Sequence, residues 1–424
     1  MILNIFLAVA IALLSLTAAY IYAPPGKYRK AFAVVAFMAV LARLVIVFYI
    51  YRNGTDTFGT DGLLYHQEGI EVAAKLDAGA SLFGVSYDYT WYTVFIGLVY
   101  HIFGINRYLV SFINIVFAFI SGMTLLKLAL HHKYRFANAA LISLGFLFFP
   151  NLVLWTADSR KEALLILVCF LGWASVQDFI INVRLKGSIA ANILRILFIC
   201  LLMWFSTLIR IYMFIPLFLG ILTSQFFLYL KTKCRMCLVF MAASVLCALL
   251  IFTSVMIPLS KDYHAVDFSG TQGDNILEDA SSKIAVVGSI ASERNLFLSI
   301  VDYLVLPLPG SINIADINSS PKVKLLVRMD MAVWYVCLFL VLTGIYTTLK
   351  NRDSCFMGLL AYIAAYVFIN ALVVENVSDT ILRYRSVIVG LVILFIDGNV
   401  IKEILRRLGN LFRGEPTSSY MFRH

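Results

Sequence analysis

Apolar runs of roughly twenty residues recur along this chain, and they constrain its fold more than any other feature. A helix of that length crosses the hydrocarbon core of a bilayer. The composition agrees, because 61% of the 424 residues are hydrophobic and only 14% are charged. Soluble domains carry about a quarter charged residues. We therefore expect an all-α, polytopic transmembrane protein.

We expect about eleven spans, and we place residues 1–400 in a single polytopic membrane domain. The predicted spans are 3–23, 31–50, 108–130, 138–157, 163–182, 189–208, 212–230, 238–257, 331–349, 355–373 and 386–400.

The charges between these runs orient the predicted spans. Lys and Arg collect in APPGKYRK, HHKYR, VRLKG, KTKCR and KNRDS, which stand at every second connection. Cytoplasmic loops carry such an excess of basic residues. The topology therefore predicts a plasma (inner) membrane protein whose N-terminus is outside and whose C-terminus is cytoplasmic. It also accounts for the net charge of +10, and no nucleic-acid motif accompanies that charge.

Two large loops fall on the extracytoplasmic side in this topology, 51–107 and 258–330. The first contains TWYTVFIGLVYHIFG and the second NLFLSIVDYLVLPLPG, and we expect each stretch to form a short interfacial helix. The tail 401–424 alternates basic and apolar residues. This alternation predicts a cytoplasmic amphipathic helix on the inner membrane surface.

The first large loop carries a group of ionisable residues in DTFGTDGLLYHQEGIEVAAKL, which begins at Asp56. Asp61 stands at the start of a predicted helix, where the helix dipole favours its anionic form. Tyr65 follows one turn later on the same face and is a substrate-binding candidate. Asp61 is the first catalytic candidate, because an ionised carboxylate serves as a general base, ligates a metal or orients a hydroxyl.

Two weaker catalytic candidates accompany it. Asp56 is the second carboxylate, and His66 is the side chain that shuttles protons near neutral pH. The alternative is that the ionisable side chains of this loop are simply solvated, as most exposed charges are.

Cations gather at three predicted extracytoplasmic turns, against the positive-inside bias. Misplaced charge of this kind is a functional hypothesis, and arginine matches phosphate oxygens with two parallel donors. We expect these cations to bind a lipid-linked phosphate or pyrophosphate, with snorkelling to lipid headgroups as the alternative. The candidates are Arg160, Lys161, Arg210, Arg383 and Arg385.

No metal site is predicted. The CxxC pair in KTKCRMC, Cys234 and Cys237, has no second pair or histidines at ligand spacing. A divalent cation stays an open alternative that no motif indicates. Arg43 and Asp178 lie within or near predicted spans, and neither receives a role.

The order of the motifs resembles a known family. DGLLY follows an early span, then YTVFIGLVYHIFGINRYLVSFINIVFAF carries Gly104, Arg107 and Asn114. LGFLFFPNLVLW then precedes SRKEALLI, and Arg-Tyr-Arg precedes the last span. Over roughly residues 55–390 this layout resembles the GT-C superfamily of integral-membrane glycosyltransferases. It is similar to members from bacterial capsule and exopolysaccharide loci.

The resemblance implies an activity and partners. The activity is transfer of a sugar from a polyprenyl-phosphate-linked donor to a lipid or glycan acceptor on the extracytoplasmic face, in cell-surface polysaccharide synthesis. Asp61 is then the base or acceptor-positioning residue, and Arg383 and Arg385 hold donor phosphate. Membrane lipids and other polysaccharide-assembly proteins are the further expected partners. The chain departs from the family in that the nearest acidic partner of Asp61 is Asp56, and in its predicted external N-terminus.

Three other functions stay open. A repeat-unit polymerase or ligase would use polyprenyl-pyrophosphate-linked glycans and similar chemistry. A transporter or flippase of lipid-linked glycans would need charges in mid-span or broken helices in two repeated halves. A structural scaffold would tolerate any change at Asp61 and the external arginines.

Overall fold

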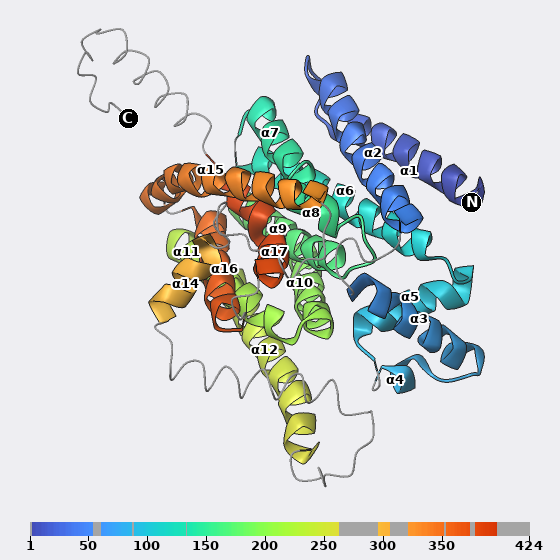
Figure 1. Ribbon diagram of the computed structural model, residues 1–424. Coiled ribbons are helices and arrows are strands. Elements are labelled where there is room, and N and C mark those ends of the chain that lie inside the picture. The colour runs from blue at the N-terminus through green and yellow to red at the C-terminus, as the bar shows by residue number, and fades with distance from the viewer. Residues whose placement is uncertain are drawn as a thin grey trace.

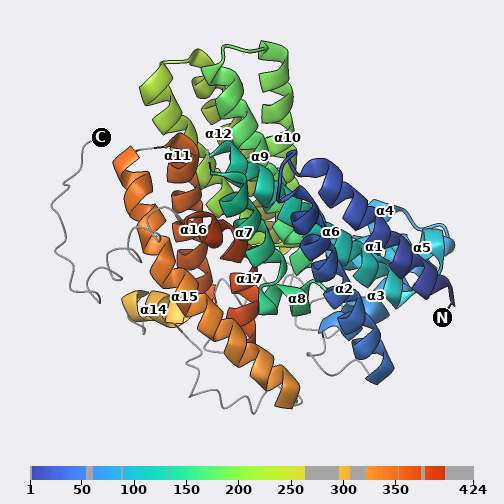
Figure 2. The same ribbon diagram turned by 90° about the horizontal axis from the view of Figure 1, so that it is seen from above.

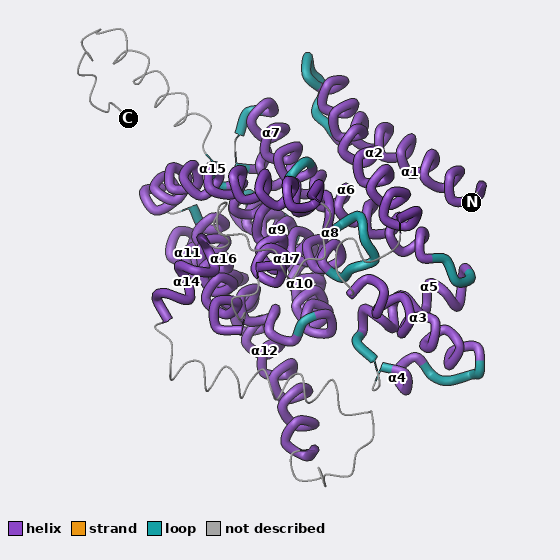
Figure 3. The backbone as a smooth tube through the Cα atoms, in the orientation of Figure 1, coloured by secondary structure: helices purple, strands orange, loops and turns teal. Residues whose placement is uncertain are grey.

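The computed structural model describes residues 2–53, 61–86, 89–132, 134–262, 296–305, 321–351, 353–373 and 378–396. In these ranges the chain forms helices joined by short turns, without a strand (Figure 3). The all-α prediction is confirmed for this part of the chain. The helices are α1 (Ile2–Tyr22), α2 (Arg29–Asn53), α3 (Asp61–Asp77), α4 (Leu82–Val85), α5 (Trp91–Phe103), α6 (Arg107–His131), α7 (Phe136–Leu147), α8 (Pro150–Trp155), α9 (Glu162–Arg184), α10 (Ile189–Ile209), the 3₁₀ turn η2 (Ile211–Met213), α11 (Phe214–Thr232), α12 (Arg235–Asp262), α14 (Leu296–Val305), α15 (Pro321–Asn351), α16 (Ser354–Val373) and α17 (Ser378–Leu394).

Eight helices in the described ranges are long and apolar enough to cross a membrane. The chain is therefore a multi-pass, all-α membrane protein, as predicted. The eight are Ile2–Tyr22, Arg29–Arg52, Arg107–His131, Glu162–Arg184, Ile189–Ile209, Phe214–Thr232, Arg328–Lys350 and Ser354–Leu372.

The prediction of one continuous span at 138–157 is wrong. This run is split into α7, which ends at Leu147, and the six-residue α8, which begins at Pro150. Proline has no N–H to donate and disfavours helical geometry in the residue before it. Phe149 accordingly has φ −61° and ψ 121°, which is extended backbone.

Two other predicted spans lie only in part among the residues whose side chains the structure describes. The run 238–257 lies in α12, whose described apolar part is Arg235–Ile251, and the run 386–400 begins in α17, whose apolar part is Tyr384–Leu394. The described ranges therefore hold eight helices of spanning length, compared with eleven predicted spans. The predicted tail 401–424 lies outside the described residues.

Both short helices predicted in the two large loops are present, as α5 and α14. α5 does not lie alone, because it packs along α3 at the side of the bundle (Figure 1). Thr93 Oγ1 donates to Glu68 Oε2 at 2.9 Å near one end of the pair, and His101 Nδ1 lies 2.5 Å from Asp77 Oδ1 at the other. The two helices therefore run parallel.

The core lies around α9 and α17, which occupy the middle of the helix assembly in both views (Figures 1 and 2). α9 packs against α6 and α10, and α11 packs along α16. The α11–α16 contact depends on glycine, since small residues let helix backbones approach closely in membranes. A Cβ at Gly358 would lie 2.6 Å from the carbonyl oxygen of Gly220 and 2.5 Å from the Ser224 Cβ.

We predict that Gly358→Ala destabilises the bundle. The added methyl group has no room, and overpacking of this kind costs about 1–3 kcal/mol. The measurement is the melting temperature of the purified protein in detergent, which we expect to fall. Gly145→Ala is the matched control, because a Cβ there meets nothing within 4 Å. A melting temperature equal to that of the wild type for Gly358→Ala would contradict this account of the α11–α16 contact.

Candidate functional site

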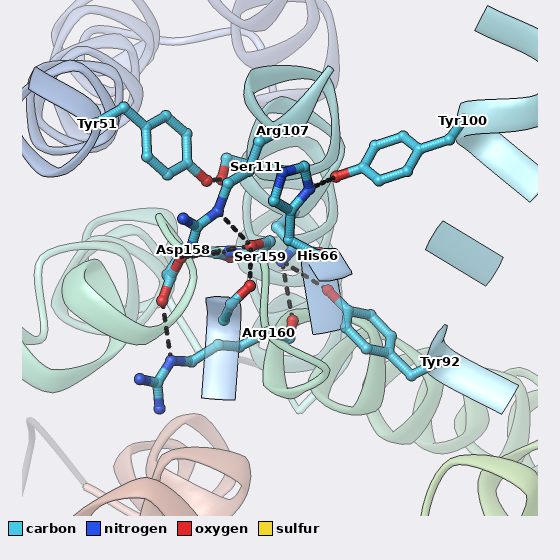
Figure 4. Close-up of polar contacts among 11 residues, drawn as sticks. Tyr51, His66, Tyr92, Tyr100, Arg107, Ser111, Asp158, Ser159 and Arg160 are labelled. Atoms are coloured by element: carbon cyan, nitrogen blue, oxygen red, sulfur yellow. Dashed lines mark hydrogen bonds and ion pairs between the residues drawn. The ribbon is translucent and has the colours of Figure 1, made fainter. Parts of the chain in front are cut away.

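The start of α3 rests directly on the turn 156–161, which joins α8 to α9 (Figure 4). Ser159 Oγ donates to the carbonyl oxygen of Gly62 at 3.2 Å. A Cβ at Gly62 would lie 2.5 Å from Asp158 Oδ2, so this approach requires glycine. The contact brings Asp61, the neighbour of Gly62 in the chain, to the turn that carries Asp158 and Arg160.

Asp158 is the centre of a buried ion group on this turn. Its Oδ2 lies 3.0 Å from Arg160 Nε, and its Oδ1 lies 3.6 Å from Arg107 Nη2. The backbone N–H of Ser159 donates to the same Oδ1 at 2.8 Å. The side chains of Asp158 and Arg160 are 4% and 1% exposed, so the pair is held away from water. Two guanidiniums thus meet at one carboxylate.

Neighbouring helices fix the geometry of this turn. Asn114 of α6 donates from Nδ2 to the carbonyl oxygens of Asp158 at 2.7 Å and Arg160 at 2.8 Å. Its Nδ2 also lies 3.2 Å from the hydroxyl of Tyr92 on α5. Arg107 lies over the Tyr51 ring of α2, with Cζ 4.8 Å from the ring centroid. Side chains of α2, α5 and α6 therefore hold the turn in place.

The next turn of α3 adds Tyr65 and His66 to this region. Lys161 Nζ lies 5.7 Å from the centroid of the Tyr65 ring, which packs edge-on against Tyr92. His66 Nδ1 and the Tyr100 hydroxyl share a 2.7 Å hydrogen bond. Burial, and then the positive charge of Arg107, lower the pKa of His66 below its usual 6.5. The imidazole is therefore neutral at pH 7, in the form that accepts a proton.

A second group of buried arginines begins with Arg210, which contacts Glu162, the first residue of α9. Arg210 Nη2 lies 3.0 Å from Glu162 Oε1, and both side chains are almost fully buried. The Arg210 guanidinium also stacks on the Tyr384 ring, with Cζ 4.0 Å from the centroid. Arg210 is therefore connected to the turn through Glu162, the residue that follows Lys161.

Arg385 follows Tyr384 in α17 and is 2% exposed. Its guanidinium lies 5.4 Å from the ring centroid of Trp334 and 6.0 Å from that of Tyr303. Nη1 donates to the sulfur of Met331 at 3.6 Å, a weak acceptor. Nε and Nη2 have no hydrogen-bond partner in the described part of the chain. These two nitrogens form the edge of arginine that binds carboxylates and phosphates with two parallel bonds.

The structure brings most of the predicted site residues into one region. The first two turns of α3, which carry Asp61, Tyr65 and His66, lie beside the 156–161 turn. That turn itself contains Arg160 and Lys161, and Arg210 is connected to it through Glu162. Asp56 lies outside the described residues, and so does the side chain of Arg383, whose backbone is part of α17. Within the described ranges, no group of three or more His, Cys, Asp or Glu side chains is arranged to hold a metal ion.

Sequence reasoning assigned no structural role to the residues that assemble the site. Asp158 was visible as an acid within a basic turn, but nothing in the sequence paired it with Arg107, 51 positions earlier. Asn114 is one polar residue in a long apolar run, which is the signal that marks a buried hydrogen-bonding role. Neither a scan against protein-family models nor a search of curated proteins gives a match for this chain.

We predict that Asp158→Asn disrupts the turn. The substitution removes the carboxylate that lies 3.6 Å from Arg107 and 3.0 Å from Arg160, and breaking a buried ion pair costs about 3–5 kcal/mol. We expect a lower melting temperature in detergent and loss of activity. Asp77→Asn is the control, because the Asp77 side chain is 66% exposed in its pair with His101. Equal stability of both variants would show that the Asp158 group does not hold the turn.

We also predict a pH dependence from His66. Its pKa is lower in the folded protein than in the unfolded chain, so the unfolded chain binds the proton more readily. The associated stability is intact above pH 6.5 and falls as the pH drops below that value. Melting temperatures of the wild type and of His66→Gln, measured between pH 7 and pH 5, test this. The wild type should lose more stability than the variant over that interval, and parallel curves would refute the assignment.

Proposed function

We propose that this protein is a membrane glycosyltransferase. It moves a sugar from a polyprenyl-phosphate-linked donor to a lipid or glycan acceptor on the extracytoplasmic face of the plasma membrane, in cell-surface polysaccharide synthesis. The single observation that carries the proposal is the buried guanidinium of Arg385 with its unbonded Nε and Nη2 edge. Buried donors without hydrogen-bond partners are costly, so a bound oxyanion that accepts two parallel bonds is the natural partner of this edge.

The phosphate of the donor accounts for the other cations as well. Arg210 stacks on the ring of Tyr384, the residue that precedes Arg385, and its Nη1 also has no hydrogen-bond partner among the described residues. Phosphate oxygens between these two side chains would be neutralised by donors that are already in position. Preorganised donors of this kind stabilise the charge that develops on a leaving group.

Asp61 supplies the base in this proposal. Its carboxylate takes the proton of an acceptor hydroxyl while that oxygen attacks the anomeric carbon of the donor sugar. The bond between the anomeric carbon and the phosphate oxygen breaks, and polyprenyl phosphate leaves with both electrons. Attack opposite the leaving group inverts the anomeric configuration. His66, neutral at pH 7, is a second proton acceptor in the same region.

Asp158, Arg107 and Arg160 have a different role in this scheme. Arg160 was expected to bind phosphate, but its Nε is engaged by Asp158 at 3.0 Å. We assign these three residues to holding the turn against α3. Phosphate binding falls to Arg210 and Arg385, with Lys161 and Tyr65 beside the sugar.

A repeat-unit polymerase or ligase is the second candidate. The observation in its favour is that Arg210 and Arg385 both offer unbonded donors, which suits the two phosphates of a polyprenyl-pyrophosphate-linked glycan. Both candidates act on a lipid-linked donor, and they differ in whether one sugar or a whole repeat unit is transferred.

We predict that Asp61→Asn removes activity. Cells that lack the protein are complemented with each variant, and surface and lipid-linked glycans are measured at equal protein level. Removal of a general base lowers the rate by about 100-fold or more, so the glycan product should be lost. Arg385→Lys keeps the charge but loses the two-donor edge, and we expect a strong reduction. Glu71→Gln is the control, since Glu71 accepts a hydrogen bond from the Tyr89 hydroxyl on an exposed surface away from the 156–161 turn.

The outcomes separate the candidates. Loss of product with accumulation of a lipid-linked donor carrying one sugar supports the transferase. Accumulation of complete lipid-linked repeat units supports the polymerase or ligase. Full glycan production by both Asp61→Asn and Arg385→Lys would reject both enzymes and favour a transport or scaffold function.

A further inference from the structure

The break between α7 and α8 exposes backbone hydrogen-bonding groups inside the bundle. The N–H groups of Phe148 and Phe149 still donate to the carbonyls of Leu144 and Phe146 in α7. The carbonyl of Leu147 and the N–H of Asn151, which would pair in a continuous helix, instead bond to side chains of other helices. Lipid offers no hydrogen bonds, so a break of this kind persists only where neighbouring protein groups satisfy it. Two buried charged side chains from distant helices do so here.

Arg43 of α2 binds the carboxyl ends of both short helices. Its side chain is 1% exposed, and Nη1 donates to the carbonyl oxygen of Leu147 at 2.7 Å. Its Nε donates to Thr156 Oγ1 at 2.9 Å, and Thr156 is the residue that ends α8. The guanidinium therefore lies at the two helix ends where the backbone dipole is negative.

Asp330 of α15 binds the opposite end of α8. It is 4% exposed, and its Oδ1 accepts a hydrogen bond from the backbone N–H of Asn151 at 2.8 Å. Asn151 is the second residue of α8, where the backbone dipole is positive. In the described part of the chain, neither Arg43 nor Asp330 has an ion-pair partner within 4.0 Å. The positive charge of Arg43 thus lies at the carboxyl ends of α7 and α8, and the negative charge of Asp330 lies at the amino end of α8.

α8 has only six residues and leads directly into the turn that carries Asp158 and Arg160. A helix so short has little stability of its own, so its position depends on the side chains that bind its two ends. We propose that Arg43 and Asp330 are positioning residues for the 156–161 turn and thereby for the contact of that turn with α3. The functional part of this inference rests on the proposed function, which places Asp61 at that contact.

Asp330 also connects the turn with the second cation group. It interacts electrostatically with Arg385, the residue assigned to donor phosphate. One carboxylate therefore acts on both the start of α8 and the guanidinium of α17.

The test is local hydrogen exchange of the purified full-length protein, measured by mass spectrometry in lipid nanodiscs. Asp330→Asn keeps the shape of the side chain and removes its charge, and Arg43→Lys keeps the charge but loses the planar donors. We expect roughly tenfold faster exchange in segments 150–161 and 62–66 of both variants, as one charge-assisted hydrogen bond is weakened. Exchange in α11 should stay at the wild-type rate.

Asp178→Asn is the matched control. Asp178 pairs with Lys127 at 2.6 Å in the last two turns of α6, so its removal deletes an ion pair that lies outside α8 and the 156–161 turn. This variant should leave exchange in segments 150–161 and 62–66 unchanged. Surface glycan is measured in parallel in complemented cells, and we expect it to fall for Asp330→Asn and Arg43→Lys.

Each other result overturns the inference. Faster exchange throughout the helices of Asp330→Asn would mean a general structural role. Unchanged exchange in 150–161 with normal glycan would mean no positioning role, and unchanged exchange with lost glycan would mean that Asp330 acts directly on the substrate. Failure of the proposed function gives a different pattern, in which Asp61→Asn keeps its glycan while the local exchange of Asp330→Asn is still raised.

Discussion

Satisfaction of polar groups inside an apolar helix bundle is the constraint on which this structure depends. Lipid cannot replace a missing hydrogen bond, so every helix end and every charge within the bundle needs a partner from the protein. The interrupted run of α7 and α8 creates the strongest demand of this kind. Arg43 and Asp330 meet it by binding helix ends of opposite polarity. Because the apolar run is interrupted, the chain can form the 156–161 turn on which α3 rests.

The buried arginines of the described residues differ in how many of their donors the protein satisfies. Arg160 is paired with Asp158, and Arg210 with Glu162, at 3.0 Å in each case. Arg385 instead lies among Trp334 and Tyr303, with two nitrogens unbonded. The acids hold Arg160 and Arg210 in place, and the unbonded Nη1 of Arg210 and the Nε and Nη2 edge of Arg385 are the donors that the proposed function assigns to phosphate.

A continuous series of contacts connects these groups. The turn ends at Lys161, Glu162 follows it and binds Arg210, and Arg210 stacks on Tyr384. Tyr366 of α16 donates to the carbonyl oxygen of Tyr384 at 2.8 Å, which ties the series to the close-packed α11–α16 pair. The start of α3 and the open edge of Arg385 are thus parts of one framework. Function in the proposed reaction requires such rigidity, because small misplacements of a reacting group lower rates strongly.

The sequence by itself determined the class of the protein and the set of residues that are candidates for the site. Long apolar runs dictate helices in a membrane, and carboxylates or arginines outside those runs, such as Asp61 and Arg210, stand out locally. Only the tertiary structure decided which runs are interrupted and which charges are paired. Arg43 meets Thr156 across 113 positions, and Asp330 meets Asn151 across 179. Local periodicity encodes the face and the length of a helix, but charge pairing depends on distances between helices far apart in the chain, and these arise only when the bundle packs.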